Sequence, residues 1–237
     1  MDKIKIGLLP FYVKLYDDVW PDIRARMGAF YQSIADEFSS KGVEVVTAVP
    51  CRLEKEFRDA VHTFEAVGAD AIVTLHLAYS PSLESEKPLK NTRLPIIVLD
   101  TTETYDFSGS EQADELIYNH GIHGVQDMCC MLTRNGKKYA VEAGHWRESD
   151  VLDRVIGRVK SLKIAQAMRQ ARVGRIGSYF AGMGDFAIAP ARLKTDIGIT
   201  PVLFDFTKTK DYYAAVTEAE VSAEIEVDRQ LYDIVDV

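Results

Sequence analysis

The sequence predicts an α/β protein, a doubly wound parallel sheet of the flavodoxin-like or Rossmann-like kind followed by a second, partial α/β unit. Short apolar runs alternate along the chain with amphipathic segments, which is the pattern of βαβ units. Right-handed crossovers between parallel strands then place helices on both faces of the sheet. The length of 237 residues allows one large domain, or one domain plus part of another.

Five apolar runs are expected to form the strands of the first sheet: residues 4–9, 43–49, 69–76, 94–100 and 137–144. A helix is expected within residues 16–42, because apolar residues recur there at helical spacing. Asp17 or Asp18 suits its start, Pro21 its first turn and Gly42 its end. A second amphipathic helix is expected from residue 53 to Gly68, where the glycine ends it.

Two further helices are expected at about residues 112–134 and 150–171. The second unit then shows strands at 172–180 and 200–206, a loop and helix between them, and a helix from about Tyr212. We therefore expect residues 1–149 to form an amino-terminal domain. Residues 150–237 would form a connecting helix and the start of a second, central domain. Two strands rarely make a self-supporting sheet, so this second domain is expected to be incomplete or completed by a partner.

Composition and charge limit the function classes. Hydrophobic residues make up 47% and charged residues 27%, which is typical of soluble globular proteins. No apolar run approaches the ~18 residues that span a bilayer, and the amino terminus lacks a signal-peptide pattern, so we expect a cytoplasmic protein without membrane association. The net charge of −8 argues against nucleic acid as a partner. Cys51, Cys129 and Cys130 form no CxxC pair, so reduced thiols are expected.

The stretch NHGIHGVQDMCCML, residues 119–132, combines glycines and histidines within a predicted helix. Each helical glycine costs roughly 1 kcal/mol relative to alanine, so we expect Gly121 and Gly124 to mark close approach by a backbone or a ligand. A helical wheel places one set on the core side: Ile122, Val125, Cys129 and Leu132. It places the other set on the opposite side: His120, His123, Asp127 and Arg134. That side could line a pocket, face solvent, or hold a metal ion through His120, His123 and Asp127.

The ends of the predicted strands favour a polar ligand, because open α/β sheets bind ligands beyond the carboxyl ends of their strands. Aromatic, hydroxyl and charged side chains follow the first, third and fourth runs: Phe11, Tyr12, Lys14, His76, Tyr79, Ser80, Asp100, Thr101 and Thr102. Such groups suit a sugar, whose C–H faces pack on rings while its hydroxyls bind polar atoms. The alternative is that loop ends are polar in any case. AGMGDF, residues 181–186, lacks the full dinucleotide fingerprint and does not indicate NAD.

Four stretches together resemble a known family. In order they are IGLLPFYVKLYDD, TLHLAYSPSLES, NHGIHGVQDMCCML and GSYFAGMGDFAIA. They are similar to the amino-terminal half of L-fucose and L-arabinose isomerase-like proteins, from about residue 4 to residue 206. The resemblance implies aldose–ketose interconversion with a divalent metal, usually manganese, and trimeric or hexameric assembly. The family's metal ligands and acid/base carboxylates lie in its later half. The resemblance therefore implies that this chain alone holds no catalytic residue, metal ligand or cofactor and is inactive.

The resemblance also implies which residues contact the sugar. His123 matches the histidine of the family's NQxxHG helix, which reaches the active site of a neighbouring subunit, and His120 takes the place of its glutamine. Met183 matches a pocket-lining methionine after the first strand of the central domain, and Tyr79 matches an aromatic residue after the third strand. The expected substrate-binding residues are Lys14, Tyr79, His120, His123 and Met183. Two alternatives remain: a sugar-binding or regulatory α/β module without catalysis, and an assembly role in which the histidine face is only a subunit contact.

Overall fold

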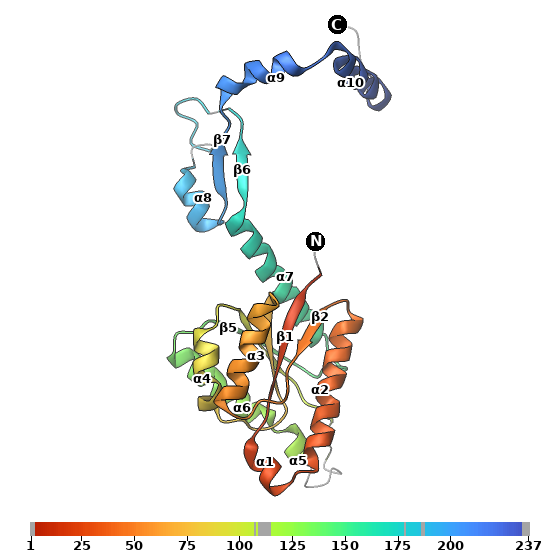
Figure 1. Ribbon diagram of the computed structural model, residues 1–237, viewed down its shortest axis with the longest axis vertical. Helices are drawn as coiled ribbons and strands as arrows, with labels where there is room; N and C mark the ends of the chain where they lie inside the picture. Colours follow the sequence, from red (N-terminus) through yellow and green to blue (C-terminus); the bar gives the residue numbers. More distant parts are fainter. Residues whose placement is uncertain (1–2, 107, 109–114, 178, 186–187, 234–237) are drawn as a thin grey trace. The chain divides into compact units, whose positions relative to one another are not determined.

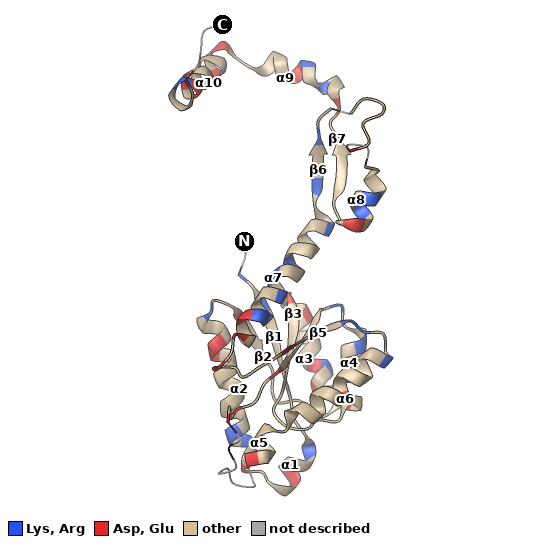
Figure 2. Cartoon of the chain, turned by 180° about the vertical axis from the view of Figure 1, so that it is seen from behind, with Lys and Arg blue, Asp and Glu red and all other residues tan. Residues whose placement is uncertain are grey.

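The computed structural model describes residues 3–106, 108, 115–177, 179–185 and 188–233. The chain divides into two units, residues 1–165 and residues 166–237 (Figure 1), and each is described by itself. Figure 2 shows acidic and basic residues together on helices of both units. Every helix in the described part of the chain is too short or too polar to cross a membrane.

The first unit is built on a five-stranded parallel sheet (Figure 1). Its strands are β1 (Lys5–Phe11), β2 (Glu44–Thr47), β3 (Ala71–His76), β4 (Ile96–Asp100) and β5 (Tyr139–Ala143). They are ordered β2-β1-β3-β4-β5, with Ile6 of β1 opposite Val45 of β2 and Leu8 opposite Val73 of β3. This is the flavodoxin-like order, so the predicted doubly wound sheet and its five strands are confirmed.

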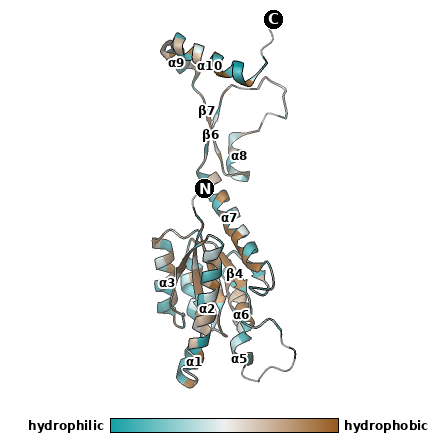
Figure 3. Cartoon of the chain, turned by 90° about the vertical axis from the view of Figure 1, so that its right-hand side faces the viewer, coloured by the Kyte–Doolittle hydropathy of each residue, from teal (hydrophilic) through white to brown (hydrophobic). Residues whose placement is uncertain are grey.

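Helices cover both faces of this sheet. They are α1 (Lys14–Val19), α2 (Ile23–Ser40), α3 (Glu54–Ala66), α4 (Ser82–Asn91), α5 (Glu115–Asn119), α6 (Gly121–Arg134) and α7 (Val151–Gln170). The core on one face contains buried residues of α2 and α7, and the core on the other contains those of α3, α4 and α6. Figure 3 shows hydrophilic and hydrophobic residues mixed along α2 and α3, as expected of helices with one buried face.

The first predicted helix is two helices. Pro21 lies between α1 and α2, and Gly42 follows α2 with a φ of +83°, which confirms the predicted end. The predicted capping role of Asp17 is wrong, because its carboxylate lies within α1 and accepts hydrogen bonds from Arg24 and Arg52. Those charge-assisted bonds lower the pKa of Asp17 against the opposing effect of its burial.

Helix α4 was not predicted, because no helix was expected between the strands at residues 69–76 and 94–100. Pro81 precedes it and Pro88 lies inside it, and both prolines are typical of loops. The helix forms because Leu89 and the Pro88 ring are buried and because the Asp127 carboxylate binds its first residue, Ser82. A tertiary contact therefore supplies the start signal that the local sequence lacks.

The long helix predicted at residues 112–134 is interrupted at His120, where α5 ends and α6 begins; residues 112–114 lie outside the described residues. Asn119 explains the interruption. Its side chain is buried, accepts a hydrogen bond from the backbone N–H of Thr104 at 2.9 Å and donates to the Thr104 hydroxyl at 3.0 Å. It therefore ties the chain after β4 to the end of α5.

Helix α7 begins in the first unit. Its residues Val151, Leu152, Val155, Ile156 and Val159 are buried in that unit's core. The division between the units accordingly falls after Ala165, inside the helix, whereas we expected the second domain to begin at residue 150. The buried carboxylate of Glu142 in β5 also binds two arginines of α7, at positions 154 and 158.

The second unit contains a two-stranded parallel sheet of β6 (Arg172–Arg175) and β7 (Thr200–Leu203). Its other elements are α8 (Pro190–Asp196), the 3-10 helix η1 (Phe206–Lys208), α9 (Thr209–Ala215) and α10 (Glu218–Leu231). The buried hydrophobic residues of the described chain all lie between Ile6 and Val159, outside this unit. The two evident strands are therefore confirmed, and the described part of the unit has no hydrophobic core of its own.

Candidate functional site

The candidate site lies in the first unit, at the carboxyl ends of β1 and β3. The strand order reverses here, since β2 and β3 flank β1 on opposite sides. Such a switch point is where doubly wound sheets bind ligands. A surface hollow of about 420 Å³ is present, lined by Val13, Leu15, Tyr16, Tyr79, His120 and His123. Three of the five residues expected to bind substrate are thus brought together.

Tyr16 and His120 form the polar part of the hollow. The Tyr16 hydroxyl lies 2.7 Å from Nε2 of His120, and the two rings meet edge to face. Burial lowers the pKa of His120, and His123 lowers it further. Burial raises the pKa of Tyr16. At neutral pH the pair is therefore an uncharged imidazole and a protonated phenol, which can each donate and accept hydrogen bonds.

His123 and Tyr79 are the more exposed walls. The ring centroids of His123 and His120 are 6.1 Å apart, and Nδ1 of His123 lies 3.3 Å from the backbone oxygen of His120. Tyr79 is 38% exposed and follows β3, so its ring faces the hollow without being fixed in the core. Val13 and Leu15 add aliphatic surface to the lining, although Leu15 is 58% exposed. The hollow thus combines aromatic and aliphatic surface with several neutral hydrogen-bonding groups.

The glycines of α6 allow this helix to approach β3. A Cβ atom added at Gly121 would lie 2.4 Å from the carbonyl oxygen of His76, and one at Gly124 would lie 2.7 Å from the His76 ring and 3.0 Å from the backbone nitrogen of Ser80. The distances of 2.4 Å at Gly121 and 2.7 Å at Gly124 are shorter than real Cβ contacts, so glycine is the residue that fits at both positions. The predicted close approach is confirmed, and the approaching group is the end of β3. The two histidines are thereby held beside Tyr79.

Several residues expected near a ligand are buried in the protein instead. His76 stacks on Phe11 with ring centroids 4.3 Å apart, and burial lowers its pKa to about 3, so it is neutral. Tyr12, Ser80 and Thr101 are also buried. Tyr12, Ser80 and Thr101 do follow strands, as predicted, but helices pack over them and remove them from solvent. The local sequence pattern does not indicate that packing.

Lys14 does not line the hollow, although its neighbours in sequence do. Its ammonium group binds both carboxylate oxygens of Asp18, at 2.6 and 2.9 Å, one turn along α1. Ile122 was expected on the core side of α6, but it is 36% exposed; Gly121, Gly124 and Met128 occupy the buried side together with Val125 and Leu132.

The described residues contain no cluster of three metal-ligating side chains. The alternative of a metal site at His120, His123 and Asp127 therefore fails. The Asp127 carboxylate accepts hydrogen bonds from the backbone nitrogen and the hydroxyl of Ser82, each at 3.0 Å, and His120 is bonded to Tyr16. Manganese, which the family resemblance implies, likewise finds no donor set among the described residues.

Met183 lies in the second unit, in the loop between β6 and α8, where it is half-buried. Gly182 beside it has a φ of +95°, a backbone conformation that favours glycine. Residues 178 and 186–187, which belong to the same stretch GSYFAGMGDFAIA, lie outside the described residues.

Tyr16, whose hydroxyl contacts His120 in the hollow, was not predicted. A usable signal existed, because Tyr16 belongs to the stretch directly after the first predicted strand and lies in α1, the short helix that follows β1.

Comparison with known proteins gives one curated relative. An L-arabinose isomerase from Shouchella clausii (strain KSM-K16) is 22% identical over 228 residues, which cover 95% of this chain. The chain resembles L-arabinose isomerase. The resemblance predicted from the four motifs is thus confirmed, and this chain spans about half the length, 46%, of that L-arabinose isomerase.

No protein-family model matches the chain. Among solved structures, a UDP-rhamnose synthase from Acanthamoeba polyphaga mimivirus is 9% identical with a TM-score of 0.32, covering 73% of this chain and 64% of that one. A periplasmic sugar-binding protein of an ABC transporter from Legionella pneumophila is 15% identical with a TM-score of 0.27, covering 94% of this chain and 86% of that one.

Proposed function

We propose that this chain is the substrate-contributing portion of a metal-dependent aldose–ketose sugar isomerase related to L-arabinose and L-fucose isomerases, inactive alone. The observation that carries the proposal is the hollow at the switch point of the sheet. It brings together Tyr79, His120 and His123, three of the four residues that the family resemblance selected within this unit; the fourth, Lys14, does not line the hollow. The similarity to an L-arabinose isomerase along 95% of the chain supports the choice of sugar.

The chemistry of the hollow suits an uncharged polyol. Tyr79 and Leu15 offer ring and aliphatic surface to the C–H face of a sugar, while Tyr16 and His120 offer neutral donors and acceptors to its hydroxyls. His120 is uncharged at neutral pH, so it does not select an anionic ligand. The chain's residues would bind and orient the sugar; we assign them no proton transfer.

The hollow is open to solvent on the side of His123. We propose that it is completed by another subunit in a homo-oligomer, a trimer or hexamer as the family resemblance implies. The metal and the acid/base carboxylates would then belong to parts of the family fold outside these residues.

A binding variant tests the site. L-Arabinose and L-fucose would be titrated by calorimetry into the 237-residue chain, its His123→Ala variant and a Gln126→Ala control on the exposed side of the same helix. Loss of a hydrogen-bonding wall should weaken binding by about tenfold in His123→Ala and leave the control unchanged. Equal affinities in all three proteins would place the sugar elsewhere.

The second candidate function is a sugar-binding or regulatory module without catalysis. The hollow favours it for the chain taken by itself, because Tyr16 and His120 offer neutral hydrogen-bonding groups suited to binding. The two functions are distinguished by mixing the chain with the part of the L-arabinose isomerase relative that this chain does not cover. An isomerase portion should gain manganese-dependent turnover, whereas a regulatory module should bind sugar and never contribute to turnover.

A further inference from the structure

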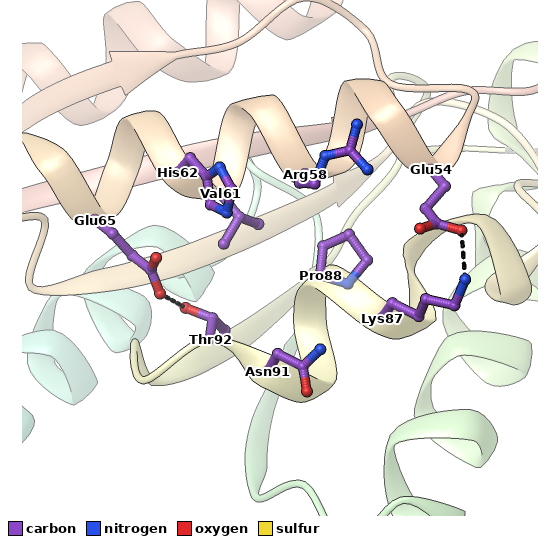
Figure 4. A pocket seen from close by; sticks show the side chains of 9 residues that line it. All are labelled: Glu54, Arg58, Val61, His62, Glu65, Lys87, Pro88, Asn91 and Thr92. Carbon is purple, nitrogen blue, oxygen red and sulfur yellow. Dashed lines mark hydrogen bonds and ion pairs between the residues drawn. The ribbon is translucent and has the colours of Figure 1, made fainter.

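A second pocket lies between α3 and α4, and it shares no residue with the hollow described above. It has a volume of about 260 Å³ and is lined by Glu54, Arg58, Val61, His62, Glu65, Lys87, Pro88, Asn91 and Thr92 (Figure 4). The α3 residues recur at helical spacing, so they form one stripe that faces the last turns of α4. The buried side chains of Val61 and Pro88 give it an apolar floor.

Both ends of this pocket are closed by contacts between the helices. At one end Nζ of Lys87 lies 3.1 Å from the Glu54 carboxylate, and at the other the Thr92 hydroxyl donates to Glu65 at 2.6 Å (Figure 4). Both carboxylates that line the pocket, Glu54 and Glu65, are therefore already paired within the protein. Lys137, which binds the backbone oxygen of Thr92, adds a positive charge near Glu65.

Three polar side chains lie between the two ends, and one of them, Arg58, forms a long ion pair. Within the described part of the chain, no hydrogen bond engages the side chains of Arg58, His62 or Asn91. A carboxylate oxygen of Asp59 lies 3.9 Å from Nε of Arg58, but Lys55 binds that carboxylate at 2.6 Å. The two terminal amino groups of the Arg58 guanidinium are therefore available. Figure 4 shows the three side chains lying between the two clamped ends.

We propose that this pocket binds a small organic oxyanion, a carboxylate or a phosphate ester, between α3 and α4. Arg58 supplies the bidentate donor pair that matches a carboxylate or phosphate, and His62 and Asn91 supply further donors. Val61 and Pro88 receive the apolar part of the ligand. The volume is below the range of about 300–1,000 Å³ usual for drug-sized ligands, so the ligand is small.

The test uses the full 237-residue chain and two probes, inorganic phosphate and malonate, at constant ionic strength set with chloride. Ring resonances of His62 would be followed by NMR during each titration. Arg58→Gln removes the guanidinium, and Arg134→Gln is the matched control, because Arg134 is exposed at the end of α6 and does not line the pocket.

The proposal predicts saturable shifts of the His62 resonances, and at least about tenfold weaker binding in Arg58→Gln with no change in Arg134→Gln. Saturation by phosphate alone identifies a phosphorylated ligand, and saturation by malonate alone identifies a carboxylate. Linear shifts without saturation for both probes, or equal weakening in the two variants, would overturn the proposal. A urea melt of each variant shows that both fold, so a lost signal is read as lost binding.

Discussion

Replacing Gly121 with alanine tests whether α6 and β3 are in the close contact that positions the histidines. The added Cβ would lie 2.4 Å from the His76 carbonyl oxygen, about 1 Å inside ordinary contact. Because the obstacle is backbone, no rotamer change relieves it, and α6 must shift at an overpacking cost of about 1–3 kcal/mol. Alanine's better helix propensity returns about 1 kcal/mol at most. We expect the free energy of unfolding to fall by about 1–2 kcal/mol.

Gly28→Ala is the matched control, since Gly28 lies inside α2 and an added Cβ meets nothing within 4 Å. The same chemical change should raise the free energy of unfolding there by about 0.4–1 kcal/mol. Urea unfolding followed by tryptophan fluorescence measures both, because Trp20 and Trp146 lie in the first unit. A Gly121→Ala protein as stable as the unmodified chain, or two variants shifted in the same direction, would refute this reasoning.

Three further predictions concern polar groups of the first unit. The pKa of His76 is about 3 in the folded chain against 6.5 ordinarily, so the unfolded chain binds a proton below pH 6.5 that the folded chain does not. The free energy of unfolding is therefore unaffected by this group above pH 6.5 and falls toward pH 3 by up to about 1.4 kcal/mol per pH unit. His76→Phe should flatten this slope in urea melts, and an unchanged slope would contradict the prediction. Asp127→Ala removes both acceptors of Ser82 and should cost about 1–2 kcal/mol, with loss of helix signal by circular dichroism; an unaltered midpoint would rule out its capping of α4. Tyr16→Phe should lower the free energy of unfolding by about 1 kcal/mol, because the hydrogen bond to His120 is lost. It should also weaken sugar binding in calorimetry. A sugar affinity equal to that of the unmodified chain would exclude the Tyr16–His120 pair from the site.

The strands and the larger helices were predictable because their signals are local. β3 is buried at every residue and reads as a continuous apolar run, which is typical of a central parallel strand. Phe57, Val61 and Phe64 mark the buried side of α3 by their spacing alone. The doubly wound class followed from the alternation of strands and helices together with the handedness of crossovers, but the choice between the flavodoxin-like and the Rossmann-like strand order required the folded sheet.

The features that failed depend on distant contacts. Helix α4 needs the carboxylate of Asp127, 45 residues beyond Ser82, to begin. The break at His120 depends on Asn119 binding Thr104, across a segment that no periodicity connects. The site also depends on residues far apart in the sequence. Tyr79 and His123 could be named from the family motifs, but only the folded sheet shows that they line one hollow with Tyr16.

Sugar recognition without catalysis by this chain is tested most directly by one titration series. The purified chain would be titrated with L-arabinose, L-fucose and their ketoses, with and without Mn²⁺, using calorimetry and a product assay on the same samples. We predict saturable binding of at least one sugar and no turnover in any sample. Manganese-dependent aldose–ketose conversion by the chain alone would contradict the claim that it is inactive alone, and the absence of binding to every sugar would contradict the site itself.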